Sequence, residues 1–250
     1  MQVVRNVGYI KQQQRRGRRF TALGFLALTA AFVLVWQQRV LGFVLASYVA
    51  MGVGFVLFNM GLQGVGKFSR RPRNDQQLDK ELERLSDRYT LIHYAQVGQR
   101  HPEHLLVHSW GVLVITAREL PGRIVVKGQR WRRGGNPLGR FLNYSGPQLG
   151  NPSLENEQDI AAVKVRLAEH GLSPEVEGLV VFTNPAATVE GESDIDIVAI
   201  EDLADYVGNL GRGRPQLTGK DRQAIVEALS QGEELEQELV RPERRQRRTA

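Results

Sequence analysis

The fold is decided by residues 103–131, which read EHLLVHSWGVLVITARELPGRIVVKGQRW. Three short apolar runs in this stretch are rich in β-branched residues or leucine and are too short for free-standing helices. They cover residues 105–107, 112–115 and 124–126, and turn-forming residues separate them at 109–111 and 121–122. We predict an antiparallel meander of three adjacent strands. The polar side chains of Glu103, Arg118 and Glu119 should then meet at one edge of the sheet.

Helices and further strands are predicted on both sides of this meander. Leucines at helical spacing from Leu78 predict an amphipathic helix, and residues 89–96 read as a strand. After the meander we predict a helix over residues 153–170, strands over 178–183 and 194–200, and a helix from Thr218 to about Leu239. This mixture of elements predicts an α/β fold.

Two uncharged runs, at residues 20–36 and 40–62, precede the α/β segment. A helix needs about 20 apolar residues to cross the hydrocarbon, with roughly 17 to 25 tolerated. We therefore predict a transmembrane hairpin over residues 20–62. A cleaved signal peptide is the alternative for the first run, but it leaves the second run unexplained.

The charges are unevenly placed along the chain. There are 33 Lys and Arg against 27 Asp and Glu, a net charge of +6, but residues 1–74 contain eleven of the basic residues and no acid. Residues 75–250 contain the remaining 22 basic residues and all 27 acids, so this part of the chain has a net negative charge. A general argument for nucleic-acid binding from the net charge of the whole chain therefore fails. Basic residues flank both outer ends of the hairpin, whereas its turn has only Arg39. The positive-inside rule then predicts a multi-pass protein of the cell membrane with both termini in the cytoplasm.

The chain contains no cysteine, which excludes disulfides, thiolate metal sites and a cysteine nucleophile. Small residues recur every four positions along the second run, at Gly42, Ala46, Ala50 and Gly54, and predict close approach of another helix, either the first run or a second subunit. The predicted layout is a basic cytoplasmic N-terminus (1–19), two transmembrane helices (20–62), a linker (63–77), an α/β domain (78–210), a C-terminal helix (211–240) and a disordered basic tail (241–250).

Several stretches carry a family resemblance. They are PEHLLV (102–107), GVLVITARELPGRI (111–124), Trp131, GNP (150–152) and VVFTNPAA (180–187). With these residues the chain resembles the nuclease-related domain (NERD) family over roughly residues 75–206. The resemblance implies a restriction-endonuclease-like core, a mixed sheet flanked by helices.

The family chemistry is a metal-dependent cut of a phosphodiester, in which two carboxylates hold Mg²⁺ or Mn²⁺ beside a lysine. Carried over by position, Glu103 stands at the first acid, Thr116 at the second acid and Arg118 at the lysine. A threonine hydroxyl is a poor replacement for a carboxylate on a hard cation, and arginine will not act as a base. We therefore expect a degenerate site without a cofactor. An active site would need Mg²⁺ or Mn²⁺ on unorthodox ligands such as Glu103 with Glu119, or Asp75.

A basic cluster surrounds one aromatic residue at the end of the deciding stretch. Its members, Lys127, Arg130, Trp131, Arg132 and Arg133, are candidates for gripping a phosphate backbone and stacking a base. A solvated turn with the tryptophan packed inward explains the same pattern. The histidines at 101, 104 and 108 and the aspartates at 194 and 196 are interpreted as polar strand positions and not as metal ligands.

These features favour a membrane-anchored, catalytically degenerate NERD-like module that binds nucleic acid or a protein partner at the cytoplasmic membrane face. One alternative is an active metal-dependent nuclease. Another is a membrane docking protein that binds no nucleic acid.

Overall fold

The computed structural model describes residues 1–36, 41–134, 148–211, 213–230 and 235–239. Its contacts separate two units. Among the described residues, the globular unit contains 1–8, 74–134, 149–211, 213–230 and 235–239, and the hairpin unit contains 9–36, 41–73 and 148. The predicted class is confirmed, because a mixed sheet flanked by helices accompanies two long apolar helices.

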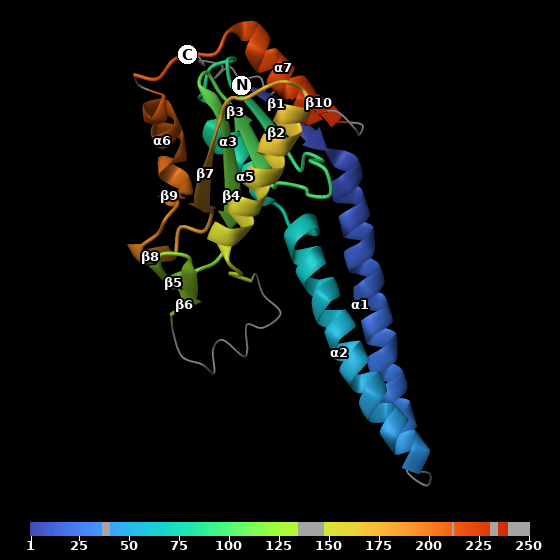
Figure 1. Ribbon diagram of the computed structural model, residues 1–250. Coiled ribbons are helices and arrows are strands. Elements are labelled where there is room, and N and C mark those ends of the chain that lie inside the picture. Colours follow the sequence, from blue (N-terminus) through green and yellow to red (C-terminus); the bar gives the residue numbers. More distant parts are fainter. Residues whose placement is uncertain (37–40, 135–147, 212, 231–234, 240–250) are drawn as a thin grey trace, which may run out of the picture. The chain divides into compact units, whose positions relative to one another are not determined.

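The hairpin unit consists of helices α1 (Val7–Trp36) and α2 (Leu41–Ser69) (Figure 1). Both are long and apolar enough to cross a membrane, and large apolar side chains such as Phe32 and Trp36 are exposed, Trp36 to 85%. The helices extend beyond the predicted runs, since α1 already begins at Val7 and α2 continues to Ser69. The part of the predicted linker that precedes Arg70 is therefore helical.

Glycines let α1 and α2 approach each other closely. A Cβ built on Gly24 would lie 2.3 Å from the backbone nitrogen of Phe58, and one on Gly61 would lie 2.3 Å from the backbone nitrogen of Thr21. Of the predicted small-residue stripe, Gly54 packs against α1. Gly42 is exposed, as is Ala46, and nothing lies within 4 Å of a Cβ built on Gly42. The intra-hairpin contact thus shares Gly54 with the predicted stripe and also uses Gly24 and Gly61, which lie outside it.

The globular unit is built on a seven-stranded sheet with the order β10-β1-β2-β3-β4-β7-β9. The strands are β1 (Gln2–Asn6), β2 (Thr90–His93), β3 (His104–Val107), β4 (Gly111–Arg118), β7 (Glu175–Phe182), β9 (Asp196–Ala199) and β10 (Leu235–Leu239). β2, β3 and β4 are antiparallel neighbours, whereas β1 pairs parallel with β2 and β7 parallel with β4 and β9. The N-terminus therefore differs from the prediction, because its first residues form a strand of this sheet.

Two pairs of helices cover the sheet. α3 (Asn74–Leu82) and α6 (Leu203–Leu210) pack on one face, and α5 (Pro152–Glu169) and α7 (Gly219–Ser230) on the other (Figure 1). Side chains alternate between the faces along each strand, so Leu106 joins the α3 core while Leu105 joins the α5 core. By the same alternation Thr116 and Arg118 belong to the α5 face and His104 to the α3 face.

The predicted three-stranded meander is wrong in its third strand. β5 (Gly122–Lys127) lies in a separate sheet with the order β6-β5-β8, together with β6 (Arg130–Arg133) and β8 (Ala187–Glu192). The physical reason is that β7 occupies the second edge of β4 over eight paired residues. The chain turns away at Gly122, whose φ of 94° suits glycine.

The C-terminal part also differs from the predicted single helix over 211–240. The structure has α7 over Gly219–Ser230, followed by the short strand β10. The helix predicted over 153–170 agrees with α5 within one residue at each end. The predicted disordered tail, 241–250, lies outside the described residues.

Candidate functional site

The site predicted from the sequence begins at Glu103, immediately before β3. The antiparallel register pairs His104 with Ile115, which places Glu103 beside the C-terminal end of β4. Its carboxylate oxygen Oε2 accepts a hydrogen bond from the backbone nitrogen of Ala117 at 3.2 Å, and the side chain is 8% exposed. The carboxylate therefore continues the β3–β4 ladder by one hydrogen bond.

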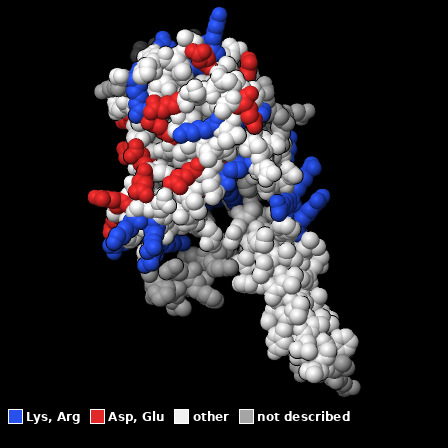
Figure 2. All heavy atoms as spheres, viewed as in Figure 1, with Lys and Arg blue, Asp and Glu red and all other residues white. Residues whose placement is uncertain are grey.

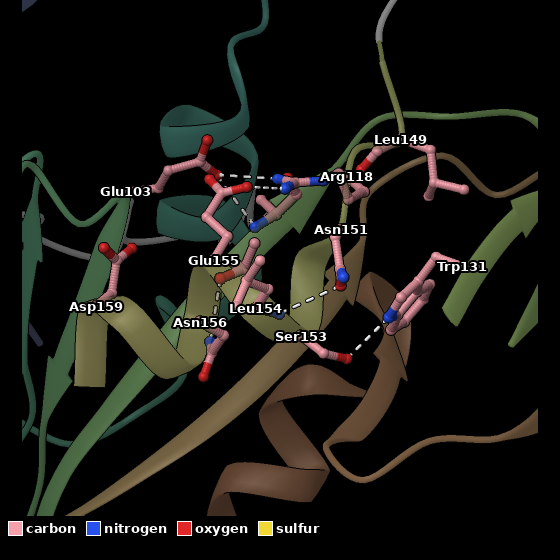
Figure 3. Close-up of polar contacts among 12 residues, drawn as sticks. Glu103, Arg118, Trp131, Leu149, Asn151, Ser153, Leu154, Glu155, Asn156 and Asp159 are labelled. Atoms are coloured by element: carbon pink, nitrogen blue, oxygen red, sulfur yellow. Dashed lines mark hydrogen bonds and ion pairs between the residues drawn. The ribbon is translucent and has the colours of Figure 1, made fainter. Parts of the chain in front are cut away.

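Arg118, the last residue of β4, is held from several directions (Figure 3). Its Nε donates to the carbonyl oxygen of Leu149 at 3.0 Å, and Nη1 donates to its neighbour's carbonyl, Ala117 O, at 2.9 Å. Nη2 forms an ion pair with Glu155 of α5, and Nη1 lies 3.9 Å from Oε2 of Glu103. The guanidinium thus joins β4, the start of β3 and the first turn of α5.

Thr116, at the position of the second acid, is bound by an amide. The side-chain nitrogen of Asn156, on α5, donates to Thr116 Oγ1 at 3.0 Å and to the carbonyl oxygens of Val114 at 2.9 Å and Leu179 at 3.4 Å. Thr116 and Asn156 are both buried. The hydroxyl therefore serves as an acceptor in a contact that joins the helix to β4 and β7.

A third acid, Asp159, lies one helical turn beyond Glu155 on α5. Burial raises the pKa of Asp159, and the nearby carboxylates of Glu155 and Glu103 raise it further. The guanidinium of Arg100, with Nε 2.6 Å from Oδ1 of Asp159, acts in the opposite direction on this pKa. The site is therefore a mixture of three carboxylates and two arginines.

Sequence reasoning did not identify the α5 contribution of Glu155, Asn156 and Asp159. The available signal was the spacing of the two acids four residues apart at the start of an amphipathic helix, since such residues share one face.

The residues present do not fit the Mg²⁺ or Mn²⁺ that the family chemistry implies. A hard cation needs several charged oxygens. The hydroxyl of Thr116 instead accepts a hydrogen bond from Asn156, and the guanidinium of Arg118 lies between Glu103 and Glu155. Throughout the described ranges, no three His, Asp or Glu side chains are grouped to hold a metal ion. Glu119 is half-buried one position past Arg118, and the structure does not join it to Glu103 in such a group.

Asp75 belongs to a second charged network, on the α3 face of the sheet. It is fully buried and lies 2.9 Å from Nε of Arg5, which also pairs with Asp79. Oδ1 of Asp79 lies 2.8 Å from Nε2 of His93, and Nδ1 of His93 lies 2.7 Å from Nδ1 of His104. Asp75 is therefore separated from Glu103 by the sheet.

His108 lies at the opposite end of β3 and stacks on the ring of Trp110, with 3.7 Å between ring centroids. Burial lowers its pKa to about 3, and the positive charge of Arg214 contributes in the same direction. His108 is thus a neutral core histidine.

The predicted basic cluster lies on β5 and β6. Lys127, Arg130 and Arg132 are exposed, and Figure 2 shows blue side chains gathered where Figure 1 places these strands. Trp131 points inward instead, because its Nε1 donates to Ser153 Oγ at 2.8 Å and its ring lies 6.3 Å from that of Phe182. Arg133 is half-buried. The exposed side of the β5–β6 hairpin therefore carries positively charged side chains, and the tryptophan ring is not among them.

Comparison with curated proteins gives no match, and comparison with solved structures gives none either. The family model described as nuclease-related domain matches residues 72–183. This segment contains α3, the strands from β2 to β7, and α5 with the whole of the site built around it. The match agrees with the resemblance carried by the motifs at 102–107, 111–124 and 180–187, and residues 72–183 of this chain are therefore similar to the nuclease-related domain family.

Proposed function

We propose that the chain is a membrane-anchored nuclease-related module that has lost metal-dependent cleavage and binds the phosphate backbone of a nucleic acid at the cytoplasmic membrane face. The observation that carries the loss of cleavage is the contact between Thr116 and Asn156. A buried hydroxyl engaged by an amide occupies the position at which the family chemistry needs a second carboxylate.

The exposed face of the β5–β6 hairpin supports binding of a polyanion. Lys127 and Arg130 are directly opposite each other across the two strands, and Arg132 is exposed two residues further along β6. Like charges directly opposite in a sheet are destabilising, and an anion placed between them relieves the repulsion. Glu192 of β8 pairs with Lys127 on its other side and offsets part of this charge.

Recognition on this surface would be of the backbone and not of the bases. With Trp131 turned toward Ser153 and Phe182, the hairpin has no exposed aromatic ring on which a base would stack. Phosphate contacts by Lys and Arg carry no sequence information by themselves. We therefore expect binding that is independent of sequence and strongly dependent on salt.

The membrane anchor is proposed from the hairpin unit. β1 precedes the hairpin and α3 follows it, and both belong to the globular unit, which supports a hairpin whose two ends lie on the same side of the membrane. Lysines and arginines flank both ends, at residues 11–19 and 67–73, and favour the cytoplasmic side.

Binding and cleavage are tested on the full chain in detergent micelles, with labelled duplex DNA at 50 to 200 mM salt. Three phosphate contacts predict a slope of log affinity against log salt of about −2.7. Arg130→Ala with Arg132→Ala should reduce that slope by about 1.8, whereas Lys164→Ala, an exposed lysine on α5, should not change it. Absence of any affinity would reject nucleic-acid binding in favour of docking. Cleavage with Mg²⁺ or Mn²⁺ that disappears in Glu103→Ala would reject the loss of catalysis.

A further inference from the structure

We propose that Arg118 is a built-in substitute for the divalent cation of the family site, and that the groups it contacts form a latent cation site that opens when the guanidinium is removed. This inference goes beyond the proposed function. It concerns what neutralises the carboxylates of Glu103 and Glu155, whatever binds to the β5–β6 hairpin.

The first step is the position of the charge. Figure 3 shows the carboxylates of Glu103, from the start of β3, and Glu155, from α5, directed at the same guanidinium. Nη2 forms an ion pair with Glu155 and Nη1 lies 3.9 Å from Oε2 of Glu103. The positive charge thus lies between two acids that come from different elements, as a bridging cation would.

The second step is the set of acceptors around that charge. Besides the two carboxylates, the guanidinium donates to the backbone carbonyls of Ala117 and Leu149. Carboxylate and backbone carbonyl oxygens are the ligands that a hard cation such as Ca²⁺ takes in proteins. Removal of the side chain would therefore leave oxygens from four residues facing one space.

The third step is the cost of leaving the acids without a cation. The side chains of Glu103 and Arg118 are 8% and 9% exposed, whereas that of Glu155 is 36% exposed, so the cost falls mainly on Glu103. Removing one partner of a buried ion pair leaves an uncompensated charge in a poorly solvated place. The other nearby arginine, Arg100, pairs with Asp159 at 2.6 Å. The ion pairs of Glu103 and Glu155 in the described part of the chain are both formed with Arg118.

The test compares the wild-type chain with Arg118→Ala in detergent micelles, by thermal unfolding in EDTA and in millimolar Mn²⁺ or Ca²⁺. In EDTA, Arg118→Ala should lower the melting temperature by about 6–12 °C. Mn²⁺ or Ca²⁺ should restore much of this loss, and the Mn²⁺ electron paramagnetic resonance signal should report the bound ion directly. The wild type should not respond. Arg123→Ala, which removes an exposed arginine paired with Glu190, is the matched control and should show neither effect.

Three results would overturn the proposal: stability of Arg118→Ala equal to that of the wild type, a loss that no cation restores, or recovery that persists when Glu103→Gln is added. If Arg118→Ala does not fold, the test uses Arg118→Met and the double variant that combines Arg118→Met with Glu155→Gln. The double variant should then be more stable than Arg118→Met alone, because it removes an acid together with its cation. Failure of the double variant to regain stability also rejects the proposal.

Discussion

The side-chain amide of Asn156 donates a hydrogen bond to the hydroxyl of Thr116 over 3.0 Å, at the point where the nuclease-related family is expected to hold its second acid. The same nitrogen reaches the carbonyl oxygens of Val114 and Leu179, so it links α5 to two neighbouring strands. Gly178 makes room for it, because a Cβ at that position would lie 2.0 Å from Asn156 Oδ1. Steric and polar constraints thus fix this corner around the Asn156 amide.

Gly178→Ala should destabilise the protein by about 1–3 kcal/mol, because the added methyl group overpacks the position of the Asn156 amide. The thermal midpoint of the full chain in micelles measures the loss. Gly208→Ala is the matched control, since nothing lies within 4 Å of a Cβ at Gly208 and alanine is a better helix former than glycine. Equal midpoints for Gly178→Ala and the wild type would contradict the close contact.

Arg5→Ala should cost about 3–5 kcal/mol of stability, because it leaves the fully buried carboxylate of Asp75 and that of Asp79 without their shared arginine. Chemical denaturation monitored by circular dichroism is the measurement. The exposed arginine Arg123 gives the comparison, and its replacement by alanine should cost less than about 1 kcal/mol. If both variants lost the same small amount, the buried network would not hold β1 in place.

His108 predicts a loss of stability in acid. Its pKa is about 3 in the folded protein against 6.5 in an unfolded chain, so only the unfolded state gains a proton as the pH falls below 6.5. The free energy of unfolding should therefore fall with decreasing pH, by about 2 kcal/mol from this group at pH 5 relative to pH 8. Urea titrations of His108→Gln should lack this component, whereas His170→Gln, at an exposed histidine, should retain it. An unchanged pH profile in His108→Gln would contradict the assignment.

Gly24→Val should loosen the hairpin, because the new side chain would collide with the backbone of Phe58. We expect the helical circular-dichroism signal to be lost at a lower temperature or a lower SDS concentration. Gly42→Val is the matched change, since a Cβ on Gly42 meets nothing within 4 Å. A similar loss in both variants would indicate an effect of valine in the helix and not of helix contact.

The elements with strong local signals were predictable from the sequence. The helix of residues 152–169 and the apolar strand that ends at Phe182 follow from periodicity and length. β1 was missed because five residues next to a basic helix give little strand signal. The course of β5 was missed because both partners of β4 are decided by tertiary pairing, which local sequence does not encode.

The candidate site was predictable only for the residues carried on the family motifs. The sequence placed Glu103, Thr116 and Arg118 in neighbouring strand positions, but their polar partners come from α5, some forty residues away from Thr116. The direction of Trp131 was left open between base stacking and inward packing. Its hydrogen bond to Ser153 depends on how α5 docks against the small sheet.

The position of β1 has a consequence for the order in which this protein is assembled during synthesis. Gln2 pairs with Thr90 on one side and with Leu239 on the other, so β1 is synthesised before both of its neighbours and must wait for them. At about 5–20 residues per second, its first partner is translated roughly 4–18 s later, after both long apolar helices have been made. Synthesis of α1 and α2 thus comes before closure of the sheet. On the proposed membrane anchorage, a chain stalled in insertion would expose an unpaired strand edge to its surroundings.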